Sequence, residues 1–142
     1  MLLMLMPYAT QADIDARYPG ELAQAGPMRD GALDTEAIAL ACAQATATVD
    51  RTLRAIGWAV PLVTVPDWVT DLAVDLALYL ATPSALASAA DFTARQTRYR
   101  AALDTLESIR RGDELPALPA DMPTATRVYV ASKPRLFGRG SL

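Results

Sequence analysis

The sequence predicts an all-α protein: a small bundle of four to five helices, with an extended C-terminal arm long enough for one short β-strand. Three observations favour this fold. Apolar residues recur at steps of three and four over several segments, which is the spacing of one helix face. Alanine is frequent and aromatic residues make up only 6% of the chain, so we expect closely packed helices around an aliphatic core. From residue 113 onward, prolines are too frequent for another long helix.

With 142 residues, the chain has the length of one domain. We divide it into an N-terminal arm (residues 1–9), a helical bundle (10–112) and an extended C-terminal arm (113–142). The opening sequence MLLMLM is apolar, but it is too short to span a bilayer and no positive charge precedes it. We therefore expect no signal peptide and no membrane partner.

The first helix is expected to begin after Thr10. The Thr10 hydroxyl can cap the free backbone N–H groups, and Asp13 three residues later completes a capping box. Pro19 and Gly20 end this helix. One more helical turn is expected at residues 21–25, before a loop rich in glycine and proline.

The second helix is expected from Asp34, its cap, to Gly57, which suits the left-handed residue after a helix. The polar side of this helix carries threonine and glutamine more than charge, which hints that a second side meets a neighbour. Cys42 is the only cysteine of the chain and falls within this alanine-rich pattern. We expect it to be a small buried apolar residue.

The central helix is expected over residues 66–82, after an apolar connector at 58–65. Pro66 suits a first helical position, and Pro83 ends the helix because the residue before a proline avoids the helical conformation. One apolar stripe is predicted on this helix, and it makes the helix a core element. The stripe contains Val69, Leu72, Ala73, Leu76, Ala77 and Leu80.

The last helix is expected over roughly residues 90–111, ended by Gly112. Arginines such as Arg95 and Arg98 are predicted to lie largely off its apolar stripe. The stripe contains Phe92, Tyr99, Ala102, Leu103, Leu106 and Ile109.

Catalytic and metal sites find little support in the sequence. The chain has no histidine and one cysteine, which excludes a Cys–His nucleophile pair, a disulfide scaffold and the usual zinc sites. No phosphate-binding glycine pattern is present. We therefore expect no enzyme activity, no metal and no cofactor.

Asp67, Asp71 and Asp75 form an acidic row on the central helix, because they recur every fourth residue. A catalytic role is the weakest interpretation of this row. From the spacing alone, the simplest placement of this row is an outer face in water.

Charge is uneven along the chain. Residues 1–75 carry ten acids and four bases, whereas residues 76–142 carry six acids and nine bases. Such asymmetry suits head-to-tail self-association or an anionic partner. A solvated basic tail without a partner is equally compatible with this composition. If the C-terminal arm binds a partner, its expected apolar anchors and pairing charges are Arg127, Val128, Val130, Lys133, Arg135, Phe137 and Arg139.

A resemblance to a known family rests on the order of short motifs over about residues 8–137. The motifs are Tyr8-Ala9-Thr10 with Asp13 and Arg17-Tyr18, then Pro61-Leu62, then the segment 72–80 (LAVDLALYL), then 100–106 (RAALDTL) through Arg111-Gly112, and finally Arg135-Leu136-Phe137. In this order the chain resembles the head-completion proteins of Mu-like phages and prophages, a branch of the head–tail connector adaptors of tailed phages.

The resemblance implies a helical bundle that assembles with itself as a ring, expected to hold twelve copies, beneath the portal protein. Such a ring extends the channel through which DNA passes without sequence-specific binding, and it offers a platform to the next neck or tail-terminator protein. In such a ring, two placements of Asp67, Asp71 and Asp75 stay open: the channel wall, where negative charge would keep DNA from sticking, or an outer face in water. The implied location is the virion neck, after assembly in the host cytoplasm. No catalysis and no cofactor are implied.

A different class of function also fits the sequence. A small helical interaction module, such as a regulator or an antitoxin-like partner, would use the same C-terminal tail to fold on a target protein. It would be absent from virions.

Overall fold

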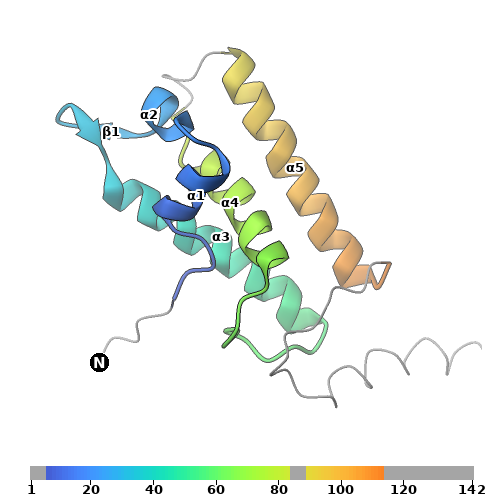
Figure 1. Ribbon diagram of the computed structural model, residues 1–142. Coiled ribbons are helices and arrows are strands. Elements are labelled where there is room, and N and C mark those ends of the chain that lie inside the picture. The colour runs from blue at the N-terminus through green and yellow to red at the C-terminus, as the bar shows by residue number, and fades with distance from the viewer. Residues whose placement is uncertain (1–5, 84–88, 114–142) are drawn as a thin grey trace, which may run out of the picture.

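The computed structural model describes residues 6–83 and 89–113, which form five helices and one small hairpin (Figure 1). The helices are α1 (Gln11–Arg17), α2 (Glu21–Ala25), α3 (Thr35–Ala55), α4 (Asp67–Leu80) and α5 (Ala89–Arg111). The hairpin pairs β1 (Met28–Arg29) with β2 (Ala32–Leu33). The predicted all-α fold of four to five helices is confirmed, and the C-terminal arm from residue 114 onward lies outside the described residues.

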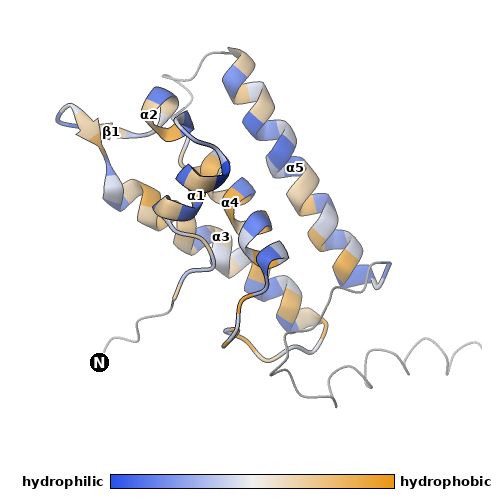
Figure 2. Cartoon of the chain, in the orientation of Figure 1, coloured by the Kyte–Doolittle hydropathy of each residue, from blue (hydrophilic) through white to orange (hydrophobic). Residues whose placement is uncertain are grey.

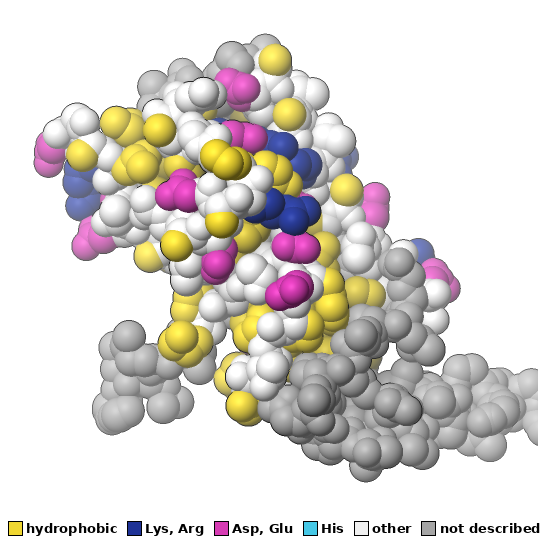
Figure 3. Space-filling view, in the orientation of Figure 1, with side chains coloured by type: hydrophobic (Ala, Val, Ile, Leu, Met, Phe, Trp, Pro, Cys, Tyr) yellow, Lys and Arg dark blue, Asp and Glu magenta, His cyan; other side chains and the backbone are white. Residues whose placement is uncertain are grey.

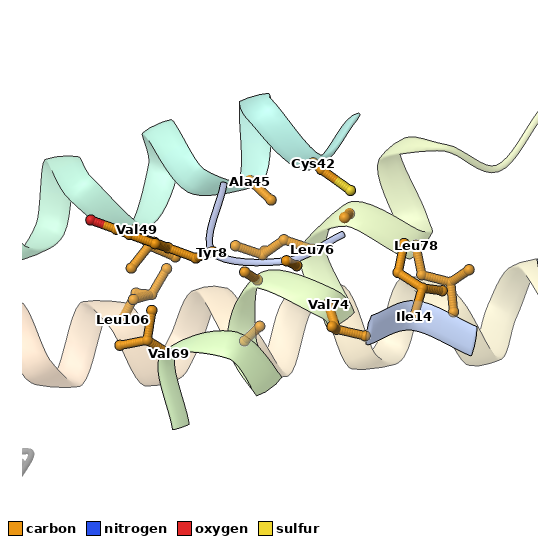
Figure 4. Close-up of a cluster of buried hydrophobic side chains, with 14 of the residues drawn as sticks. Tyr8, Ile14, Cys42, Ala45, Val49, Val69, Val74, Leu76, Leu78 and Leu106 are labelled. Atoms are coloured by element: carbon orange, nitrogen blue, oxygen red, sulfur yellow. The ribbon is translucent and has the colours of Figure 1, made fainter. Parts of the chain in front are cut away.

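Helix α4 lies at the centre of the bundle. It packs against α3, α5 and α1, while α3 also contacts α5 and α1. The core draws apolar side chains from these four helices, as Figure 4 shows for α1, α3, α4 and α5. Its fully buried members include Ile14, Val49, Val69, Leu76 and Leu78.

Two faces of α4 are buried, not one. The predicted stripe omitted Val74 and Leu78, yet each is only 1% exposed. They lie beside Ile14 of α1, which covers the side of α4 that was expected to be polar (Figure 4). Conversely, Leu80 belongs to the predicted stripe but is 38% exposed, because it is the last residue of the helix. The prediction of a single stripe was therefore wrong in these residues.

The helix ends follow the sequence closely. Thr10 and Asp13 form the predicted capping box, and the Asp34 side chain accepts the Ala37 N–H at 3.1 Å. Gly57 has the left-handed φ of +90° expected after α3. Pro66 lies one position earlier than predicted, since its extended ψ of 154° makes it the cap of α4 and not its first helical residue.

The hairpin was predicted only as a loop. Its turn residues, Asp30 and Gly31, both have positive φ, of 53° and 81°. This combination is the signature of a two-residue hairpin turn, for which Asp-Gly is a preferred sequence. The Asp-Gly pair was therefore the available signal, although strands of two residues each are too short to show alternation.

Tyr8 fastens the N-terminal segment to the bundle. Its backbone N–H donates to Thr46 Oγ1 at 2.9 Å, and its hydroxyl donates to the Asp50 carboxylate of α3. The same hydroxyl accepts the Leu62 N–H at 2.9 Å, from the loop between α3 and α4. One buried side chain thus joins three separate parts of the chain.

Because two faces of α4 are buried, substitutions at two nearby leucines of this helix should differ strongly in how much stability they remove. Leu78→Ala should lower the free energy of unfolding by about 2–5 kcal/mol, because it leaves a cavity beneath α1. Leu80→Ala, the matched control on the same helix, should cost less than about 1.5 kcal/mol because Leu80 is partly in water. Urea unfolding measures both. Equal losses for the two variants would contradict a second buried face.

Tyr8 also predicts a dependence of stability on alkaline pH. Burial, followed by the hydrogen bond to Asp50, raises the pKa of Tyr8 above its ordinary value of 10.0. The folded state then holds this proton more tightly than the unfolded state, so the stabilisation is complete below pH 10 and decreases as pH rises further. Tyr8→Phe should remove part of this alkaline loss and cost about 1–3 kcal/mol at neutral pH.

The control for this experiment is Tyr99→Phe, whose hydroxyl has no hydrogen-bond partner among the described residues. It should keep the alkaline loss of the wild type. The interpretation of Tyr8 fails if Tyr8→Phe and the wild type lose the same free energy of unfolding between pH 9 and pH 12.

Candidate functional site

The predicted partner-binding residues of the C-terminal arm lie outside the described residues. Their role therefore stays a prediction. These residues are Arg127, Val128, Val130, Lys133, Arg135, Phe137 and Arg139.

The acidic row of α4 is divided by contacts with α1. Arg17 forms an ion pair with Asp71 at 3.0 Å, and its Nε lies 3.7 Å from Asp75. The Tyr18 hydroxyl donates to Asp75 at 2.5 Å. Figure 3 shows basic side chains beside acidic ones on this face of the molecule. Asp67 is exposed and has no such partner within residues 6–83 and 89–113.

These contacts give most of the row a structural task. Burial, followed by the hydrogen bond to Asp75, raises the pKa of Tyr18, so the hydroxyl keeps its proton and remains a donor. The hydrogen bond to Tyr18 in turn raises the pKa of Arg17. Asp71 and Asp75 therefore help to hold α1 on α4, and Asp67 is the member left open to a partner.

Arg95 is buried, although the sequence analysis placed it away from the apolar stripe of α5. Its side chain is 2% exposed. The guanidinium donates to the backbone carbonyls of Ala25 at 2.8 Å and Glu21 at 2.7 Å, and to Thr82 Oγ1 at 2.8 Å. Its Nε pairs with the Glu21 carboxylate at 3.2 Å. One arginine thus joins α2, the end of α4 and α5.

The spacing of α5 contained a signal for this burial. Arg95 follows Phe92 by three residues and precedes Tyr99 by four, which puts it on the predicted apolar face. The expectation that it lies elsewhere was wrong, because the ends of α2 and α4 present carbonyl and hydroxyl oxygens that only a forked donor can satisfy together.

Glu21 serves a second arginine. Arg98 Nη2 lies 3.1 Å from Glu21 Oε1, and its guanidinium carbon lies 4.2 Å from the centre of the Tyr18 ring. The Arg98 Nε is buried and has no hydrogen-bond partner among the described residues. This cluster, which we call the Arg95–Glu21 cluster (Glu21, Arg95, Arg98 and Thr82), builds a polar joint and shows no reactive arrangement.

Cys42 is buried, as predicted. Burial, with a smaller effect of the Asp13 charge, raises the pKa of its thiol to about 11, so the thiol stays protonated at neutral pH. Residues 6–83 and 89–113 contain no group of three acidic, cysteine or histidine side chains that could hold a metal ion. None of the helices in these ranges has the length and apolar character needed to cross a membrane.

Several large apolar side chains are exposed, and they are the remaining candidates for contacts with a partner. Val63, in the loop between α3 and α4, is 90% exposed, and Leu40, on α3, is 61% exposed. Figure 3 shows hydrophobic side chains at the end of the bundle where this loop lies. The full set is Met6, Met28, Leu40, Val63 and Leu80.

The Arg95–Glu21 cluster predicts a strong effect of one arginine. Arg95→Met should lower the free energy of unfolding by about 3–5 kcal/mol, because it removes the buried donor to the oxygens of Ala25, Glu21 and Thr82 and one of the two arginines that pair with the Glu21 carboxylate. Arg100→Met, an exposed position on the same helix, should change it by less than about 0.5 kcal/mol. Thermal and urea unfolding measure both variants. A small effect of Arg95→Met would show that the cluster does not hold the bundle together.

Comparison with known proteins identifies the family. No curated protein matches the chain in sequence. A family model described as Bacteriophage Mu, Gp36 matches residues 8–131. The matched range contains all five described helices and agrees with the resemblance inferred from the short motifs. Because the match covers well over half of the sequence, this chain belongs to the Bacteriophage Mu, Gp36 family.

Proposed function

We propose that the chain is a structural protein of the phage virion, a head–tail connector adaptor that forms a ring on the portal protein. The ring extends the DNA channel and provides a platform for the next neck or tail-terminator protein. The family match over residues 8–131 is the observation that carries this proposal. The order of sequence motifs supports the narrower assignment to the neck.

The structure supports a role in binding other proteins. The polar clusters around Tyr8, Asp75 and Arg95 join elements of the bundle to one another. These contacts favour a rigid bundle, and a platform for another protein needs a rigid surface. Exposed apolar side chains at Leu40 and Val63 are available for contact with neighbours. The C-terminal arm adds four basic residues after position 122 and no acidic one.

In this proposal the arm attaches the bundle to the portal or to a neighbouring copy. Val128, Val130 and Phe137 act as apolar anchors, and the four basic residues pair with acidic side chains of the partner. The acidic row contributes less free charge to a channel than three aspartates suggest, since Asp71 and Asp75 contact α1.

The experiment starts from purified particles. Mass spectrometry should find the chain in complete virions, and antibody labelling should place it between head and tail. Its absence from virions would contradict the connector proposal and favour the interaction module that acts in the host cell.

Removal of the arm supplies a second test of the same proposal. Deleting residues 122–142 should leave the helical circular dichroism and the unfolding midpoint unchanged, because no described core residue is lost. The truncated protein should fail to complete heads in cells that lack the full chain. Deleting only residues 140–142, which keeps all seven named arm residues, is the control and should complete heads normally. Normal completion by the longer deletion would overturn the role of the arm.

A further inference from the structure

The outward face of α3 lacks charge over most of its length. From Ala37 to Val49 the helix has thirteen consecutive uncharged residues, a length of about 20 Å. In Figure 2 much of the visible part of α3 is pale to orange. A helix face in water normally carries charged residues. We call the exposed members of this segment the α3 outer face: Ala39, Leu40, Ala43, Gln44 and Ala47.

Two arginines continue this face toward the end of α3. Arg51 and Arg54 are exposed, and neither forms an ion pair or a hydrogen bond with another described residue. Within the described ranges, Arg100 on α5 is the one further arginine that is exposed and forms no ion pair or hydrogen bond with a described residue. The α3 outer face therefore ends in unpaired positive charge, and it offers an apolar contact beside a basic one.

A surface with the opposite charge lies on the loop between α3 and α4 and on the first turn of α4. We call the exposed apolar residues Ala59, Pro61 and Val63 the loop tip. Val63 is the most exposed large apolar side chain described. Asp67 follows it by four residues, is exposed, and has no ion pair among the described residues. The loop tip thus offers an apolar contact beside an acidic one.

We propose that the α3 outer face of one copy binds the loop tip of the next copy. Val63 of one copy lies against Ala43 and Ala47 of its neighbour. Asp67 then meets Arg51 and Arg54, which lie one to two helical turns further along α3.

The two surfaces differ from each other, so the contact is head to tail. Such a contact forms a ring when the rotation closes. The inference rests on the proposed function and deepens it, because it names the surfaces that build the ring. It places Asp67 at the seam between copies and not on the channel wall.

A second copy is favoured over other occupants by charge. Each chain carries both halves of the pair, an apolar surface ending in two unpaired arginines and an apolar loop followed by an unpaired aspartate. Opposite charges that meet across an interface fix its register and suppress wrong partners.

Cross-linking tests this contact directly. Ala43→Cys and Val63→Cys are made separately and together, in a chain whose native Cys42 is buried and therefore slow to react. A short bismaleimide is applied to concentrated purified protein and to particles that contain the variant. We expect dimers when the two single variants are mixed, and a ladder of larger products from the double variant. Each single variant alone should remain uncross-linked.

Charge reversal tests the register. Arg51→Glu with Arg54→Glu, or Asp67→Arg alone, should reduce cross-linking about tenfold, because like charges then face each other. Combining the three substitutions should restore most of the yield. Arg100→Glu reverses the unpaired arginine of α5 and is the matched control, which should leave the yield unchanged. A reduction by Arg100→Glu of the same size would contradict the proposed register.

Other outcomes separate the alternatives. Cross-linking of Ala43→Cys to itself would show a symmetric dimer and overturn the head-to-tail contact. Cross-links that form only after removal of residues 114–142 would assign the α3 outer face to the chain's own arm. A chain present at the neck but never cross-linked would overturn this interface and keep the connector function. Cross-linked protein that is absent from particles would keep the interface and overturn the connector function.

Discussion

The burial of α4 on two faces is the constraint on which the rest of the structure depends. Leu76 lies in the core between α4 and its neighbours α3 and α5, while Val74 and Leu78 lie beside Ile14 of α1 (Figure 4). The helices α3 and α5 cover one apolar face of α4. The other apolar face needs a third partner, which the N-terminal segment supplies as α1. The ion pair of Arg17 with Asp71 and the hydrogen bond of Tyr18 to Asp75 hold α1 there. The carboxylates of Asp71 and Asp75, which in the sequence suggest an open acidic face, therefore help to hold α1 against α4.

Polar contacts complete what apolar packing begins. Tyr8 joins the N-terminal segment, α3 and the loop before α4 through one buried hydroxyl. At the other end, Arg95 donates to backbone carbonyls of α2 and to the Thr82 hydroxyl, just after α4. Each joint links segments that are far apart in sequence, so the five helices form one body. A rigid bundle with exposed apolar side chains at Leu40 and Val63 is suited to binding other proteins.

Local sequence signals predicted the helix ends well, because caps depend on residues a few positions apart. Thr10, Asp13, Asp34 and Gly57 all act as expected. The residue pattern within a single helix could not predict which of its side chains another helix would cover. The second buried face of α4 needs α1 as its partner, and the burial of Arg95 needs carbonyls that are 70 and 74 residues away in the chain. The candidate surfaces follow the same division: the uncharged side of the second helix could be predicted from the sequence, but the exposure of Val63 in the loop between α3 and α4 could not.

A reconstruction of the neck in purified particles is the most direct test of the proposed ring on the portal. It should show a closed ring of this bundle between the portal and the next neck protein. Within it, the α3 outer face of each copy should be covered by the loop tip of its neighbour. A neck without this bundle would overturn the proposed role as a connector.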